Sequence, residues 1–232
     1  MMALKNAQPD GYTLALVPSW TLSYQPLIST HYRAEDFTLL AVLYRSPDAL
    51  IARADAPWNS LSQMLDSARN EQKTLLFASQ SPVDQLIINW LARQTGNKIA
   101  ALPTRGGGEM IPKLLGGHVD FAYSATMHTQ YVSSGKMKVL ASLTDQRQSI
   151  APDVPTLKEQ GWDIAINTFF IVVLPAGVPQ AITEHLSSAF ADIMRDEHIR
   201  SLIEDKLFMN IDVHLMKDAS SLIVGQQSKM RT

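Results

Sequence analysis

The chain has 232 residues, of which 46 % are hydrophobic and 18 % charged, so it is long enough for one large domain or two smaller ones. Its 20 Lys and Arg residues nearly balance 22 Asp and Glu residues, which argues against a nucleic-acid-binding protein. Cysteine is absent, which excludes disulfides, thiolate metal sites and cysteine nucleophiles.

The chain opens with a turn signal and a predicted strand. Gln8-Pro9-Asp10-Gly11 favours a turn, and the apolar run at residues 13–18 follows it as a strand. Residues 36–54 are long and apolar and are interrupted at Ser46-Pro47-Asp48. Because residues 166–179 are similarly apolar, we expect two long β segments on either side of the middle of the chain.

The middle of the chain alternates between short apolar runs and amphipathic stretches. This alternation predicts βαβ units and a parallel sheet. The predicted strands are residues 73–79, 98–104, 118–124 and 137–143, and the predicted helices are residues 81–96, 109–117 and 127–135. Beyond Pro179 we expect helices at about 180–195, 196–206 and 217–229 and a strand at 209–214.

This order of elements predicts an α/β protein of two lobes. Lobe one comprises residues 1–49 and 166–232, and lobe two comprises residues 50–165. We expect each lobe to be a mostly parallel sheet flanked by helices, and two crossover strands to join the lobes.

Three successive glycines, Gly106, Gly107 and Gly108, precede the predicted helix 109–117. Proline is tolerated only near the first turn of a helix, so Pro112 predicts that this helix begins no earlier than Gly108 or Glu109. The glycine N–H groups would then lie in a strand-to-helix loop, beside the positive end of a helix dipole. They could form a cradle for an anion, or the triplet could only permit a tight turn.

Two further loops occupy equivalent positions. Ser79-Gln80-Ser81 follows the strand at 73–79, and Ser124-Ala125-Thr126 follows the strand at 118–124. In a parallel sheet all three loops emerge at the carboxyl edge, where open α/β folds bind ligands. Small hydroxyl groups at three helix N-termini suit a carboxylate or a phosphate, although Ser81 could equally be a plain helix cap.

Motifs of catalysis and of metal binding are missing. No Walker loop, dinucleotide-binding fingerprint, zincin motif or nucleophile elbow occurs, and the six histidines are scattered. Ser133 and Lys136 match S-x-x-K, but Gly135 predicts a helix stop between them, which disfavours a rigid dyad. We therefore expect no enzyme activity, no metal and no cofactor.

Several stretches, in a consistent order, resemble motifs of one family, the receptors of tripartite tricarboxylate transporters, also called Bug or TctC-like proteins. The motifs are PDGYTLL, GGGEA with LLGGHVD, GKLRALA, DVPT..E.G and PAGTP. The matching stretches here are Pro9–Leu14, Arg105–Glu109 with Leu115–Asp120, Gly135–Ala141, Asp153–Gly161 and Pro175–Pro179.

The resemblance implies a periplasmic solute-binding protein with a type II periplasmic-binding-protein fold. Such a receptor would bind a small carboxylate (a di- or tricarboxylate, an amino acid or an aromatic acid) between its lobes and deliver it to membrane permease subunits. Arg105 could pair with a second ligand carboxylate, or simply be solvated. The ligand-binding residues expected on both lobes are Pro18, Ser19, Ser79, Gln80, Ser81, Arg105, Gly106, Gly107, Gly108, Glu109, Ser124, Ala125, Thr126 and Thr168.

The sequence also departs from the family pattern. The signal peptide, first strand and PGG..D loop that precede PDGYTLL in the family have no counterpart here, so the chain as written could stay in the cytoplasm. An alternative is therefore a truncated or divergent paralogue that acts as an interaction or regulatory module. Without the first strand, we expect strand 13–18 to have an open edge and the chain to self-associate through lobe one, where a complete protein would be a monomer.

Overall fold

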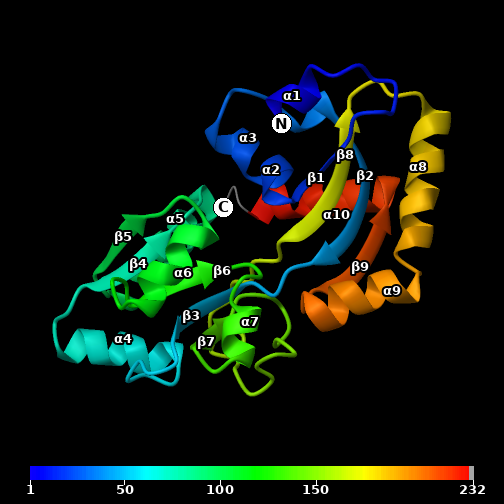
Figure 1. Ribbon diagram of the computed structural model, residues 1–232. Helices are drawn as coiled ribbons and strands as arrows, with labels where there is room; N and C mark the ends of the chain where they lie inside the picture. Colours follow the sequence, from blue (N-terminus) through cyan, green and yellow to red (C-terminus); the bar gives the residue numbers. More distant parts are fainter. Residues whose placement is uncertain (230–232) are drawn as a thin grey trace. The chain divides into compact units, whose positions relative to one another are not determined.

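The computed structural model describes residues 1–229 and divides into two compact units (Figure 1). Unit 1 consists of Met1–Ser46 and the residues from Thr168 onward, and unit 2 is Pro47–Asn167. The chain therefore passes between the units twice, and neither passage lies within a strand, whereas crossover strands were predicted.

Unit 1 contains a four-stranded sheet in the order β1-β8-β2-β9. Its strands are β1 (Ala15–Pro18), β8 (Phe169–Pro175), β2 (Phe37–Arg45) and β9 (Asn210–Leu215). All neighbouring strands are antiparallel, so the prediction of a mostly parallel sheet in this lobe was wrong. The physical reason is the path of the chain: β2 leads out of unit 1 and β8 leads back into it, so two adjacent strands must run in opposite directions.

Helices cover both faces of this sheet, which explains why its central strand β8 is apolar throughout. Along β8, Ile171 and Val173 belong to one core cluster, while Val172 and Leu174 belong to another, as the two-residue period of a strand requires. The helices of unit 1 are α1 (Met2–Lys5), α2 (Trp20–Ser23), α3 (Gln25–Ile28), α8 (Gln180–Ile193), α9 (Glu197–Ser201) and α10 (Met216–Lys229), with a 3₁₀ turn at Ala34–Asp36 and a π turn at Leu202–Lys206.

Strand β1 is at one edge of the sheet and pairs only with β8 among the described strands. Two of the leucines beside or within it are exposed, Leu14 by 39 % and Leu16 by 49 %. Self-association through this edge stays a prediction: we expect the purified chain to sediment as a dimer or larger species, because open strand edges recruit other strands. A concentration-independent monomer in sedimentation velocity would contradict it.

Unit 2 contains a five-stranded sheet in the order β5-β4-β6-β3-β7. Its strands are β3 (Ala49–Arg53), β4 (Leu75–Ser79), β5 (Ile99–Pro103), β6 (Phe121–Ser124) and β7 (Met137–Ser142), and its helices are α4 (Leu61–Asn70), α5 (Pro82–Thr95), α6 (Gly107–Leu115) and α7 (Thr129–Ser133). Strands β5, β4 and β6 run parallel, as predicted, whereas β3 runs antiparallel to both its neighbours. The rings of Phe77 and Phe121, fully buried on β4 and β6, meet edge to face at 4.9 Å.

Candidate ligand-binding site

Three loops of unit 2 meet at the carboxyl edge of its parallel strands, as the sequence predicted. Thr104, directly after β5, donates hydrogen bonds from N and Oγ1 to the Ser79 carbonyl at the end of β4, at 2.7 and 3.1 Å. Gln80 Nε2 donates to the Tyr123 carbonyl on β6 at 3.0 Å. The α6 N-terminus also contacts the β6–α7 loop, since a Cβ added to Gly107 would overlap Met127 Sδ.

The glycine triplet does not lie wholly before the helix, so that prediction was wrong. Helix α6 begins at Gly107, and only Gly106 precedes it, as an N-cap residue with φ 107°. Pro112 therefore lies inside the helix, where its ring faces the carbonyl of the residue four positions earlier, Gly108. A Cβ added to Gly108 would have no atom within 4 Å, so this side of the first helical turn is open.

Even so, the three glycine amides are available to a ligand. Within residues 1–229, no acceptor contacts the N–H groups of Gly106, Gly107 or Gly108, whereas the next two amides, of Glu109 and Met110, both donate to the Gly106 carbonyl. The glycines are partly or fully exposed. Three such amides at the positive end of a nine-residue helix can hold an oxyanion.

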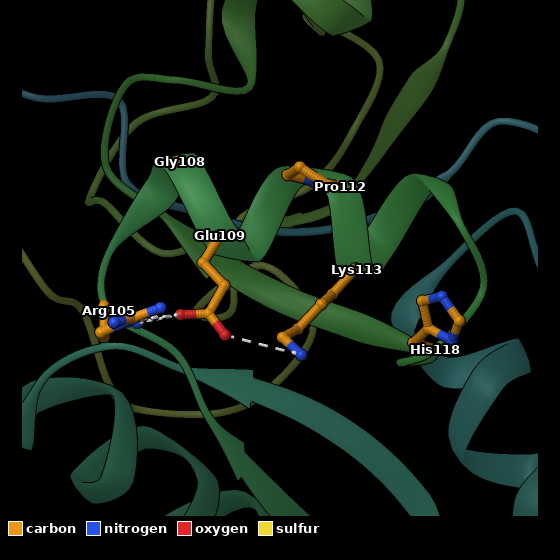
Figure 2. A pocket seen from close by; sticks show the side chains of 6 residues that line it. All are labelled: Arg105, Gly108, Glu109, Pro112, Lys113 and His118. Atoms are coloured by element: carbon orange, nitrogen blue, oxygen red, sulfur yellow. Dashed lines mark hydrogen bonds and ion pairs between the residues drawn. The ribbon is translucent and has the colours of Figure 1, made fainter.

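Arg105 and Glu109 bind to each other beside these amides (Figure 2). Glu109 Oε2 accepts the Arg105 backbone N–H at 2.9 Å and its Nε at 3.3 Å, and Lys113 Nζ lies 3.6 Å from Oε1. The backbone N–H of Arg105, followed by its side chain and the charge of Lys113, keeps the pKa of Glu109 below its usual range. The Arg105 side chain is 96 % exposed, so its cation is solvated as well as paired.

A hollow of about 610 Å³ lies beside α6, and the residues that line it are spread along this helix (Figure 2). Gly108 contributes to it, so the space beside that glycine is open to solvent. Its lining residues are Arg105, Gly108, Glu109, Pro112, Lys113 and His118.

In the β4–α5 loop, the carboxylate of Asp84 accepts hydrogen bonds from Gln80 and Ser81, which were predicted to bind a ligand. Asp84 is fully buried, and its Oδ2 accepts the Gln80 N–H at 2.6 Å while its Oδ1 accepts the Ser81 hydroxyl. Burial raises the pKa of Asp84, although these hydrogen bonds oppose the rise. Ser81 is the N-cap of α5, and its S-x-x-D spacing is a capping signal from which Asp84 could have been found.

In the β6–α7 loop, the Ser124 side chain also forms its hydrogen bonds within the protein, to His128. It is 1 % exposed, and its Oγ lies 3.2 Å from the His128 backbone N and 3.1 Å from His128 Nδ1. Ala125 and Thr126 are partly exposed, and the Thr126 hydroxyl has no hydrogen-bonding partner in the part of the chain that is described. His128 was not singled out from the sequence as a functional residue.

The site residues predicted in unit 1 form part of its own framework. Ser19 is buried, its N–H donates to the Phe169 carbonyl at 2.7 Å, and its Oγ accepts the Phe169 N–H at 3.2 Å. The Thr168 carbonyl accepts both donors of Ser46, N–H at 2.9 Å and Oγ at 3.2 Å. The Pro18 carbonyl accepts the Thr21 hydroxyl at 2.5 Å.

Comparison with known proteins assigns the family. The model of the tripartite tricarboxylate transporter family receptor, TctC, matches residues 1–231. The chain belongs to the TctC receptor family. Proteins of this family are periplasmic solute-binding receptors and not enzymes, so the resemblance seen in the sequence is confirmed.

Individual TctC relatives agree with this assignment. A UPF0065 protein of Cupriavidus necator, from the gbd 5' region, is 30 % identical over 195 residues, which cover 82 % of this chain and 59 % of the relative. BugT of Bordetella pertussis is 26 % identical, with 88 % of this chain and 62 % of BugT covered. The chain thus spans about three fifths of the curated relatives that it matches.

A solved TctC solute-binding protein from Polaromonas is 29 % identical and superimposes with a TM-score of 0.76, covering 98 % of this chain and 79 % of that one. The two-lobed α/β fold predicted from the sequence is therefore confirmed. No described helix is both long and apolar enough to cross a bilayer.

Proposed function

We propose that this chain carries the ligand-binding site of a periplasmic receptor for a small carboxylate, and that the ligand carboxylate binds to the amides of Gly106, Gly107 and Gly108. The observation that carries the proposal is that these three adjacent amides have no acceptor within residues 1–229 and begin a helix. Amides at a helix N-terminus bind oxyanions without a countercharge from a side chain. Membership of the TctC family supports the same ligand class.

The choice of test ligands follows from solved proteins of the same fold. MatC of Rhodopseudomonas palustris was solved with malate and superimposes with a TM-score of 0.83 at 23 % identity. A second R. palustris protein was solved with adipate, at a TM-score of 0.87 and 20 % identity. Identities this low support the fold alone and do not select one ligand. A binding test should therefore include short and long dicarboxylates, together with citrate, glutamate, aspartate and an aromatic acid.

The proposed cellular role is delivery of the bound acid to the permease subunits of a tripartite tricarboxylate transporter. We propose that two lobes serve this role: lobe one, residues 1–49 with 166–232, and lobe two, residues 50–165. The alternative role is a non-transporting module that binds no acid.

A thermal-shift panel tests the proposal. A ligand at about 100 times its dissociation constant should add about 2.7 kcal/mol to the free energy of unfolding. Since 1 kcal/mol shifts the melting temperature of a chain this size by about 2–4 °C, we expect about 5–10 °C for the right acid. The amide derivative of that acid, which keeps its size but lacks the charge, is the control and should give no shift. An unchanged melting temperature with every acid would favour the non-transporting alternative.

A further inference from the structure

A chain of buried hydrogen bonds runs from the β6–α7 loop to the start of unit 2. His128 is 0 % exposed, and its two ring nitrogens lie 3.1 Å from Ser124 Oγ and 2.9 Å from Gln148 Oε1. Gln148 Nε2 in turn donates to the carbonyls of Pro47 and Asp48 at 2.7 and 3.0 Å. These residues come from separate parts of the sequence, and the proposed function leaves the imidazole without a role.

The direction of every hydrogen bond in this chain can be assigned. Because Gln148 Nε2 donates to two carbonyls, Oε1 must be the atom that faces His128, and His128 Nε2 must carry a hydrogen. Burial lowers the pKa of His128 to about 4, so the ring is neutral and Nδ1 is an acceptor. The Ser124 hydroxyl therefore donates to Nδ1, while its oxygen accepts the His128 backbone N–H.

The loop that these bonds close lies against the glycine amides. Met127 Sδ occupies the space that a Cβ on Gly107 would take. The amides of Ala125, Thr126 and Met127 have no acceptor among the described residues, so their orientation is not fixed by hydrogen bonds of their own. Two sets of hydrogen bonds close the loop. At its base Ser124 Oγ bonds to the His128 backbone N–H and ring, and further along the Thr126 carbonyl accepts the Thr129 N–H and hydroxyl at 3.2 and 3.0 Å.

We infer that His128 is a positioning residue, which fixes the Ser124 hydroxyl and thereby holds residues 125–127 as a second wall beside the Gly106–Gly108 amides. The inference rests on the proposed function for its ligand, but not for the order of the loop. A deletion of the imidazole would leave the Ser124 hydroxyl hydrogen without its acceptor and Gln148 Oε1 without its donor, so plain loss of stability must be separated from loss of position.

Two substitutions of His128 distinguish the loss of stability from the loss of loop position. Asparagine places Oδ1 where His128 has Nδ1, so His128→Asn can still accept the Ser124 hydroxyl. Glutamine places its amide where His128 has Nε2, so His128→Gln keeps the bond to Gln148 and loses the bond to Ser124. Each variant loses one buried hydrogen bond, and Leu65→Ala, a truncation in the core under α4, reports the effect of instability alone.

Amide hydrogen exchange of the unliganded protein tests the position of the loop. We expect exchange of the Thr129 amide, which closes the loop by donating to the Thr126 carbonyl at 3.2 Å, to rise at least about tenfold in His128→Gln and in Ser124→Ala, and by less than about threefold in His128→Asn and Leu65→Ala. The double variant Ser124→Ala/His128→Gln should exchange no faster than Ser124→Ala, because Ser124→Ala already removes the bond that His128→Gln removes. Equal exchange in the Asn and Gln variants, or additive effects in the double variant, would overturn the inference.

Titration calorimetry with malate and adipate then measures the effect on binding. For an acid that the parent binds, the dissociation constant should rise about tenfold in His128→Gln and less than about threefold in His128→Asn. Equal affinities in parent and His128→Gln would overturn the role in binding. If the parent binds neither acid while exchange responds as expected, the proposed ligand fails and the positioning of the loop stands.

Discussion

Replacing Gly108 with valine should weaken carboxylate binding at least about tenfold, a loss of about 1.4 kcal/mol of binding free energy, while changing the free energy of unfolding by less than about 0.5 kcal/mol. Gly108 is in the first turn of α6 with φ in the ordinary range, and a Cβ there meets no atom within 4 Å. The fold can therefore accept the side chain. A Cβ in a helix tilts toward the N-terminus, so the isopropyl group would screen the glycine amides from a ligand.

The chain offers a matched control for this substitution. Gly225 lies inside α10 in unit 1, also without an atom within 4 Å of an added Cβ and with an ordinary φ. Gly225→Val should leave both affinity and stability close to those of the parent. Urea unfolding and calorimetry on the three proteins decide the matter, and parent-like affinity in Gly108→Val would show that the ligand binds elsewhere.

Lowering the pH from 6.5 to 4 should cost unit 2 about 3 kcal/mol through His128 alone. The pKa of this buried imidazole falls from 6.5 in the unfolded chain to about 4, mainly because burial disfavours the charged form. Between these values the unfolded state binds the proton and the folded state does not, so stability is full above pH 6.5 and declines as the pH falls toward 4.

Urea unfolding at a series of pH values checks this, with tryptophan fluorescence as the probe, since Trp58, Trp90 and Trp162 lie in unit 2. Other groups also respond to acid: the lowered pKa of Glu109 adds to the loss at lower pH, and the raised pKa of Asp84 opposes it. The parent minus His128→Asn difference isolates the imidazole, because asparagine does not titrate. Parallel stability curves for the two proteins would contradict the expectation.

The fold of unit 2 could be predicted because its signals are local. Apolar runs such as residues 73–79 alternate with helical spacing, and the right-handed βαβ path then fixes the parallel order of β4, β5 and β6. Strand direction in unit 1 depends on the route through unit 2, which no local pattern encodes. The helix start was misplaced because proline favours the first turn, whereas Pro112 lies inside α6.

The candidate site was only partly visible from the sequence. The glycine triplet and the three loops were found from spacing, and the structure brings these loops together. The capping role of Asp84 could have been predicted, because it lies three residues after Ser81. Its complete burial could not be predicted from that spacing. The bond from Gln148 to Pro47 joins residues 101 positions apart, so the network around His128 could be found only from coordinates.

The place of unit 2 within the chain has a consequence for the order of folding. Ser46 and Thr168, 122 residues apart, are joined by hydrogen bonds where the chain leaves unit 1 and returns, next to the pairing of β2 with β8. Pairing these strands in an unfolded chain requires closing the whole intervening loop, and the entropy of closure grows with loop length. A folded unit 2 is a compact body between the two strands, which shortens the effective loop. The continuous segment from Pro47 to Asn167 should therefore fold early and act as the template on which the two halves of unit 1 meet.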